Sequence, residues 1–318
     1  MSTVNPIKFV FTGHVDSGKS TLSGRLLYHS GAVPEHQMEE LRRKAEANKM
    51  KTWEYAYLLD VYDEEQARGK TIEYNLVEFT YQGQRYQLVD CPGHQVYIRS
   101  LLAGLNVTRP SETIGCLVVS LAEGEYEAGM GGGQTREDTL LLRATGITEL
   151  IVVLNKIDLV PVESPRYQKI KAEIENYVKK LGFRTVRLLP VSAYHGQGLS
   201  ELLELLRELH RTMPPPPVQT PLITASTIKI QARLMYDEDY KLLFSVGFAF
   251  VLHCGTQEYQ VTIDQLSDAN GTQRLPFAVN GTVVTAVVTC SSGFQVRLGD
   301  RVILRTEGRT IGFGAVRG

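Results

Sequence analysis

The stretch Gly13-His-Val-Asp-Ser-Gly-Lys-Ser20 decides the fold of this chain. It matches the pattern GxxxxGK[ST], and it stands between an apolar run, Ile7–Thr12, and a helical pattern, Ser20–Tyr28. The glycines of the stretch let the backbone curl, so that successive N–H groups point inward as an anion nest. The helix that follows adds the positive end of its dipole. The sequence therefore predicts a phosphate-binding loop between a strand and a helix, the first unit of a P-loop α/β domain.

Two side chains at the end of this loop have the chemistry that a nucleotide phosphate requires. The Lys19 ammonium can reach β- and γ-phosphate oxygens, and the Ser20 hydroxyl can ligate Mg²⁺. We expect the whole loop to contact the nucleotide, through Gly13, His14, Val15, Asp16, Ser17, Gly18, Lys19, Ser20 and Thr21.

A second motif, Asn155-Lys-Ile-Asp158, ends the apolar run Leu150–Asn155 and favours a guanine base. Asp158 can accept hydrogen bonds from both the N1–H and the 2-amino group of guanine. Adenine offers neither group, so a site built around this carboxylate discriminates by roughly 10⁴ or more. The Lys156 stem can lie over the purine ring, and Asn155 can bond the base and join the loops around it. A later loop could supply N–H groups to guanine O6, from Ser192, Ala193 and Tyr194.

A third motif, Asp90-Cys-Pro-Gly-His94, follows the apolar run Tyr86–Asp90. Asp90 would hold Mg²⁺ through a water molecule, and the Gly93 N–H would meet the γ-phosphate without a side chain in the way. His94 follows directly, where it could orient the attacking water. We therefore predict that His94 is the catalytic residue.

The charged stretch Asp63–Glu73 lies between the first and third motifs and precedes a strand. Within it, Thr71 can offer its hydroxyl to Mg²⁺ and its N–H to the γ-phosphate. Loss of that phosphate would release the stretch, as in an order–disorder switch. The predicted Mg²⁺ ligands are thus Ser20, Thr71 and, through water, Asp90.

Short apolar runs alternate with helical patterns as far as about residue 212. Alternating β and α elements, with runs such as Ile151-Val-Val-Leu that are apolar throughout, predict a doubly wound, mostly parallel sheet. The expected strands are Ile7–Thr12, Asn75–Tyr81, Tyr86–Asp90, Ile114–Leu121, Leu150–Asn155 and Val186–Pro190. The expected helices are Ser20–Tyr28, Gln37–Ala47, Val96–Leu105, Gln134–Arg143, Ser164–Leu181 and Leu199–His210.

The pattern of apolar and polar residues changes after the run of prolines at Pro214–Pro217, which cannot continue a helix. Period-2 alternation then dominates, with turn signals such as Asn270-Gly, Asn280-Gly and Ser292-Gly, and predicts a small antiparallel β-barrel. The expected strands are Ile223–Arg233, Leu242–His253, Tyr259–Ile263, Val283–Thr289, Phe294–Leu298, Val302–Arg305 and Arg309–Val316. We divide the chain into a nucleotide-binding domain (1–212), a proline-rich linker (213–221) and a barrel (222–318).

Composition narrows the class of protein. The chain is 43% hydrophobic and 22% charged, as globular chains are, and its net charge of −1 argues against indiscriminate nucleic-acid coating. We expect no DNA partner. The four cysteines form no CxxC pair, and the sequence has no signal pattern and no apolar run of membrane-spanning length. The cytosol is therefore the expected compartment, without membrane contact.

The order of GHVDSGKS, RGKT, DCPGH, NKID and SAY resembles that of translation-factor GTPases. The chain resembles the elongation factor alpha/Tu type of this family. Within that type, it most resembles the class-II release-factor and Hbs-type ribosome-rescue GTPases. The matches that favour this branch are Trp53–Asp60, Gly69–Glu73, and Glu123–Gly129 with Gly132–Glu137. The resemblance gives nucleotide or metal roles to the motif residues above, the catalytic role to His94, and a monovalent cation near Asp16.

Family members carry two β-barrels after the nucleotide-binding domain, whereas this chain has room for one. Phe244–Cys254 and Gly299–Gly314 resemble the last barrel of the family, so the middle barrel is expected to be missing. In carrier factors the middle barrel helps to grip aminoacyl-tRNA, and in release and rescue factors the last barrel helps to hold a tRNA-shaped protein.

The resemblance implies a Mg²⁺-dependent GTPase that binds GTP and GDP, switches between two states and docks on ribosomes. Its turnover would be slow unless stimulated, because no arginine finger is evident. The expected partner is a tRNA-shaped release- or rescue-factor protein held by the barrel. Two alternatives stay open: an elongation-type carrier of aminoacyl-tRNA, and a non-ribosomal interaction module that binds GTP with weak hydrolysis.

Overall fold

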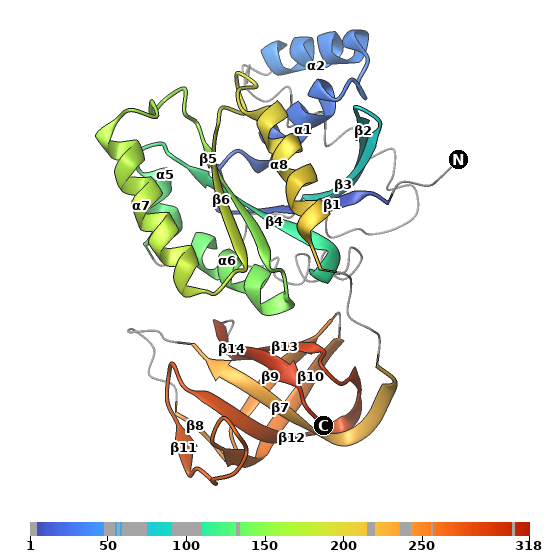
Figure 1. The fold of residues 1–318 in the computed structure, drawn as a ribbon, viewed down its shortest axis with the longest axis vertical. Coiled ribbons are helices and arrows are strands. Elements are labelled where there is room, and N and C mark those ends of the chain that lie inside the picture. The colour runs from blue at the N-terminus through green and yellow to red at the C-terminus, as the bar shows by residue number, and fades with distance from the viewer. Residues whose placement is uncertain are drawn as a thin grey trace. The chain divides into compact units, whose positions relative to one another are not determined.

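The N-terminal part of the chain folds around a six-stranded sheet and the C-terminal part forms a closed β-barrel in the computed structural model of the protein (Figure 1). The two parts are separate compact units, the first made of Met1–Arg143 and Ile147–Pro216 and the second of Pro217–Gly318 with Ala144–Gly146. The structure describes residues 5–47, 55, 58, 75–90, 110–131, 134–214, 220–235, 243–255, 257–306 and 309–318.

The strands of the first unit lie in the order β2-β3-β1-β4-β5-β6. Their bounds are β1 Ile7–Thr12, β2 Asn75–Tyr81, β3 Gln84–Asp90, β4 Thr113–Ser120, β5 Glu149–Asn155 and β6 Thr185–Val191. Only β2 runs antiparallel to its neighbour in this sheet. Every residue of β4 and β5 is buried, as expected of strands covered on both faces. The predicted doubly wound, mostly parallel sheet is confirmed.

Helices lie on both sides of this sheet, with α1 and α8 on one side and α5 to α7 on the other (Figure 1). Their bounds are α1 Lys19–His29, α2 Glu35–Ala47, α5 Glu125–Met130, α6 Gln134–Thr145, α7 Pro165–Lys180 and α8 Leu199–Thr212, with a 3₁₀ turn at Pro110–Glu112. The buried leucines of α8 recur at helical spacing, and they join Phe9, Phe11 and α1 residues in one core. α7 begins where the Ser164 side chain accepts a hydrogen bond from the Tyr167 N–H, with Pro165 in the first turn.

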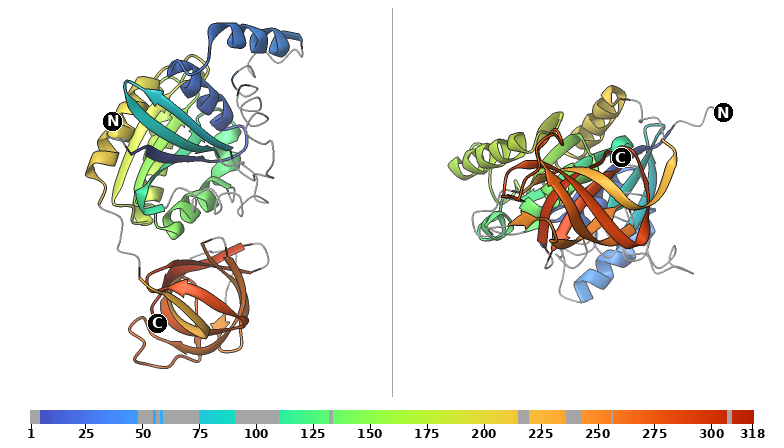
Figure 2. Two further views of the ribbon diagram at one scale, coloured as in Figure 1. Left: turned by 90° about the vertical axis from the view of Figure 1, so that its right-hand side faces the viewer. Right: turned by 90° about the horizontal axis from the view of Figure 1, so that it is seen from below.

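Six strands close the barrel of the second unit in the order β10-β12-β7-β14-β13-β9, all antiparallel, as predicted (Figure 2). Their bounds are β7 Leu222–Leu234, β9 Ala249–Cys254, β10 Gln257–Ser267, β12 Val283–Arg297, β13 Arg301–Thr306 and β14 Arg309–Val316. A separate two-stranded sheet pairs β8, Phe244–Ser245, with β11, Phe277–Ala278. The barrel interior is filled by alternate residues of its strands.

Two strand predictions in the barrel were wrong. The expected turn at Ser292-Gly293 lies inside the single strand β12, whose register against β7 shifts between Thr289 and Phe294. Gly293 has a φ of 76°, which suits a bulge as well as a turn. The expected strand Leu242–His253 is divided into β8 and β9.

The predicted helix Val96–Leu105 and most of the proline run lie outside the described residues. Among the helices that the structure does describe, none combines the length and the apolar character that a membrane crossing requires.

Candidate nucleotide-binding site

The phosphate loop leaves the end of β1 and enters α1 through two glycines. Gly13 has a φ of 143°, and a Cβ there would lie 2.2 Å from the Val118 carbonyl oxygen. Gly18 has a φ of 90°, and a Cβ there would lie 2.3 Å from Asn155 Nδ2. Both positions therefore exclude any side chain, because the backbone approaches neighbouring groups too closely and adopts left-handed angles.

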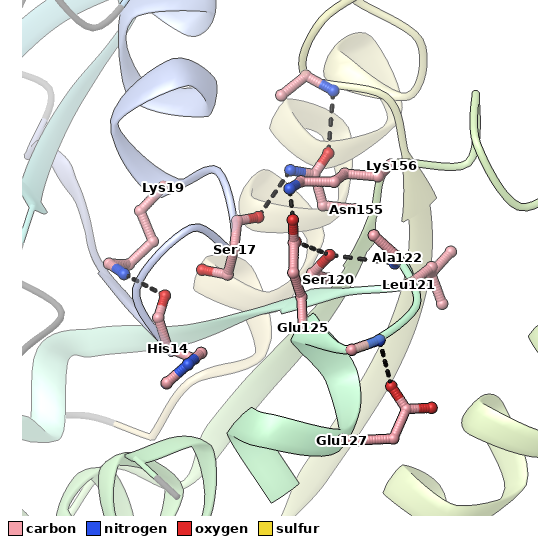
Figure 3. A network of polar contacts seen from close by, with 12 residues as sticks. His14, Ser17, Lys19, Ser120, Leu121, Ala122, Glu125, Glu127, Asn155 and Lys156 are labelled. Atoms are coloured by element: carbon pink, nitrogen blue, oxygen red, sulfur yellow. Dashed lines mark hydrogen bonds and ion pairs between the residues drawn. The ribbon is translucent and has the colours of Figure 1, made fainter.

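Lys19 is folded back over this loop. Its Nζ donates to the carbonyl oxygen of Gly13 at 2.7 Å. It also donates to the carbonyl oxygen of His14 at 2.8 Å (Figure 3). The side chain is buried, with 7% of its residue surface exposed. The loop thus holds the ammonium group over its own backbone, where an anion in the nest would meet it.

Several features of the loop fit a phosphate group. Gly18 caps α1 without a side-chain hydrogen bond, so the first N–H groups of the helix have no side-chain acceptor at the cap. Ser17 Oγ is buried and has no hydrogen-bond partner in the described part of the chain. Asp16 adopts a φ of 63°, which is uncommon for a residue with a side chain and is typical of functional loops. A bound phosphate would accept hydrogen bonds from Ser17 Oγ and from N–H groups at the start of α1.

Two of the three predicted Mg²⁺ ligands lie on neighbouring elements at this end of the sheet. Ser20 is exposed in the first turn of α1. Asp90 is buried at the end of β3, opposite Phe11 of β1. Hydroxyl and carboxylate oxygens are the donors that Mg²⁺ prefers, so the two residues fit the ion. Thr71, Gly93 and His94 lie outside the described residues.

Asn155 joins the phosphate loop to the predicted base loop. Its Nδ2 donates to the Ser17 carbonyl at 2.9 Å, and its Oδ1 accepts from the Ala193 N–H at 3.0 Å. The side chain stands at the end of β5 and is 2% exposed (Figure 3). One residue thereby fixes the distance between the two ends of the site.

Asp158 and Ser192 meet across the base loops. Ser192 Oγ donates to Asp158 Oδ1 at 2.5 Å and accepts from the His195 N–H at 3.1 Å. Asp158 is exposed, whereas Ser192 is fully buried. The carboxylate is thus oriented by the protein at the surface, where a base could reach it. Tyr194, two residues after Ser192, is 47% exposed.

Lys156 adopts a φ of 72°, and its Nζ lies 2.5 Å from Glu125 Oε2 on α5. Ser120 Oγ donates to the same oxygen at 2.6 Å. Burial raises the pKa of Glu125, but the hydrogen bonds from Lys156 and Ser120 outweigh it and hold the pKa below its ordinary value. Glu125 therefore orients Lys156 (Figure 3), a role that the sequence did not predict.

A second unpredicted residue, Asp138 of α6, contacts the start of the phosphate loop. Its Oδ2 accepts from the Gly13 N–H at 3.1 Å. The available signal was a carboxylate at helical spacing from the buried Leu141 and Leu142, on the face of α6 that packs inward.

Comparison with known proteins agrees with this geometry. Residues 5–212 match the family model of the elongation factor Tu GTP binding domain. The chain belongs to this family of translation-factor GTPases. Residues 225–318 match the elongation factor Tu C-terminal domain, and only 213–224 lie between the two matched regions.

Two curated relatives illustrate how much of each protein is shared. The GTP-binding subunit of the eukaryotic peptide chain release factor from Kluyveromyces lactis is 37% identical over 204 residues, 62% of this chain and 29% of that protein. An elongation factor 1 alpha-like protein from Schizosaccharomyces pombe is 34% identical over 320 residues, 92% of this chain and 52% of that protein. The chain thus spans about half or less of the length of these relatives.

Among solved structures, the GTPase-like domain of S. cerevisiae Ski7, bound to GTP, is similar with a TM-score of 0.77. The similarity covers 98% of this chain and 97% of the other at 15% sequence identity, so it supports the fold alone.

Proposed function

We propose that this chain is a Mg²⁺-dependent GTP-binding and GTP-hydrolysing switch of the translation-factor type, which acts on ribosomes together with a release- or rescue-type protein. The observation that carries the proposal is the bridge made by Asn155 between the Ser17 and Ala193 backbones. It joins a loop suited to phosphates to a loop suited to guanine in a family of GTP-binding domains.

In this proposal the triphosphate lies in the nest of residues 13–18, on the N-terminus of α1, and Lys19 turns from backbone carbonyls toward phosphate oxygens. Asp158, held by Ser192, accepts from the N1–H and 2-amino groups of guanine. Ala193 and Tyr194 border the base, and the Lys156 stem covers it while Glu125 holds the ammonium group.

Mg²⁺ would be held by Ser20, Thr71 and, through a water molecule, Asp90, and when bound it would neutralise charge of the β- and γ-phosphates. We further propose that His94 orients the attacking water and that Gly93 contacts the γ-phosphate. A monovalent cation beside Asp16 belongs to the same proposal.

The ribosomal part of the proposal rests on the relatives, one of which is named a release-factor subunit. Only 213–224 separate the two matched regions, so we propose that the chain works without a middle barrel and engages a tRNA-shaped protein through its single barrel. Such a factor would meet ribosomes in the cytosol.

A single-turnover GTPase assay with and without ribosomes tests this function. We expect tight GTP binding, slow intrinsic hydrolysis and acceleration by ribosomes. His94→Ala should bind GTP as the unmodified protein does but lose the acceleration. Tight GTP binding without any ribosomal effect would instead favour a non-ribosomal interaction module, and protection of aminoacyl-tRNA from hydrolysis would favour a carrier.

A further inference from the structure

Asp138 has a buried carboxyl group that contacts the first residue of the phosphate loop. It stands on α6, is 6% exposed, and accepts from the Gly13 N–H at 3.1 Å. The Thr12 hydroxyl, at the end of β1, also bonds to it. A helix outside the predicted motifs therefore holds the residue at which the loop begins.

The same glycine is fixed from two further directions. It packs against β4 so closely that a Cβ would lie 2.2 Å from the Val118 carbonyl oxygen. Its own carbonyl oxygen accepts from Lys19 Nζ at 2.7 Å. Asp138 accepts from the N–H of Gly13, and Lys19 donates to the carbonyl oxygen of the same residue. The carboxyl group and the ammonium group are therefore linked through hydrogen bonds to Gly13 as well as through their opposite charges.

We propose that Asp138 is a positioning residue of the phosphate loop, and that its carboxyl group takes up a proton when the phosphates of a guanine nucleotide bind. This inference rests on the proposed nucleotide site. Without nucleotide, the charge of Lys19 acts on Asp138 and lowers its pKa. Bound phosphates compete for that cation and bring further negative charge, which favours the neutral carboxyl group. The neutral group can keep its place beside Gly13.

The surroundings of Asp138 allow this exchange near neutral pH. Burial raises the pKa of Asp138 to about 7, against the lowering effects of the Thr12 hydroxyl, the Lys19 charge and the Gly13 N–H, while Glu137 on the same helix raises it further. Added phosphate charge moves the pKa upward again, so binding takes up a proton. By reciprocity, raising the pH above 7 should weaken nucleotide binding.

Isothermal titration of the full chain with GDP and Mg²⁺ at pH 7.5, in buffers of different ionisation enthalpy, counts the protons exchanged. We expect the unmodified protein to take up more protons than Asp138→Asn, by a difference of at most about 0.8, because a carboxyl group with a pKa of about 7 is already about one quarter protonated at pH 7.5. Its GDP affinity should fall with pH relative to the variant, by at most about tenfold per pH unit. Protons of GDP itself contribute equally to both proteins.

Glu137→Gln removes the same charge one residue away and should keep the uptake. Thr12→Val removes a group that favours the ionised carboxyl, so its uptake should shift to higher pH; this variant tests the inference even if Asp138→Asn does not fold. Equal proton uptake and equal pH dependence in the unmodified protein and in a folded Asp138→Asn would overturn the inference while leaving nucleotide binding intact. Absence of GDP binding by the unmodified protein would overturn the proposed function as well.

Discussion

At the scale of single residues, Asn155 determines the geometry of the site. Its Oδ1 and Nδ2 are both engaged by backbone groups of the two loops, and the side chain is buried. A buried amide in this position acts as a spacer, because neither loop can move without leaving a polar group unpaired.

We predict that Asn155→Ala lowers the free energy of unfolding by about 1–3 kcal/mol, since it leaves the Ser17 carbonyl and the Ala193 N–H without their partner. The affinity for GDP should fall in parallel. Urea denaturation and titration with a fluorescent GDP measure the two effects. Gln197→Ala, at an exposed side chain of the same loop, is the matched control and should change neither.

Asp158 carries the second prediction at this scale. In Asp158→Asn the amide presents a donor where guanine also presents one, whereas xanthine presents a carbonyl oxygen. We expect guanine nucleotides to weaken by about 10- to 100-fold and xanthine nucleotides to gain. Competition titrations with GDP and XDP measure this. An unchanged preference for GDP would mean that Asp158 does not contact the base.

At the scale of elements, α5 supports the base loop through the pair of Glu125 and Lys156. Glu125 has a pKa below its ordinary value of 4.5, so its ion pair contributes stability that is present above pH 4.5 and is lost as the pH falls through the folded pKa. Glu125→Gln should therefore be less stable than the unmodified protein at neutral pH, by less than about 1 kcal/mol because the pair is partly exposed. The two proteins should converge in thermal melts as the pH falls through the folded pKa of Glu125.

A control variant shows whether the effect of Glu125→Gln comes from the ion pair of Glu125 and Lys156 or from the loss of a negative charge. Glu175→Gln removes a partly exposed carboxylate that pairs with Lys179 within α7, and provides the control for charge alone. Glu125→Gln should also weaken GDP binding, because it releases Lys156, whereas Glu175→Gln should leave GDP binding unchanged. An equal change in GDP affinity would contradict the orientation of Lys156 by Glu125.

The helices and strands differ in how well the sequence predicted them. The parallel strands were predictable because each apolar run is followed by a motif or a helical pattern, and β1 and β2 have the expected bounds. Gly293 misled the prediction because a left-handed glycine suits a turn and a bulge equally, and only the pairing of β7 with residues on both sides of Gly293 decides between them. α5 went unnoticed because it is short and contains Gly129, which weakens a helical pattern.

The same physical reason explains which site residues were missed. The phosphate loop and the NKxD motif are local, so their residues were visible in the sequence. Asp138 contacts Gly13 across 125 positions, and Glu125 contacts Lys156 across 31. Neither contact has a local signature, because each depends on how helices pack against the ends of the sheet.

At the scale of the whole molecule, the nucleotide site and the barrel belong to different compact units. A ligand that binds only the folded first unit should stabilise that unit by about 2.7 kcal/mol when its concentration is 100-fold above its Kd. We therefore predict that Mg²⁺ and GDP raise the unfolding temperature of the first unit and leave that of the barrel unchanged.

Hydrogen exchange during thermal or urea unfolding can measure the two units separately. Protection should increase in β1, β4 and β5 with GDP, and should stay the same in β7 and β12. Asp158→Asn provides the control, because its response to GDP should weaken. Equal protection of both units by GDP would show that the barrel is energetically coupled to the nucleotide site.

The closed ring of six strands limits how a partner can bind to the barrel. In the part of the chain that the structure describes, each of the six strands pairs with a neighbour on either side over part of its length, so the ring leaves little backbone edge for an incoming strand to extend. Recognition of the ring should then depend mainly on outward-facing side chains and turns, which can be exchanged one at a time without weakening the hydrogen-bonded frame. Evolution could thus change the binding preference of this surface gradually, while the scaffold that presents it keeps its shape.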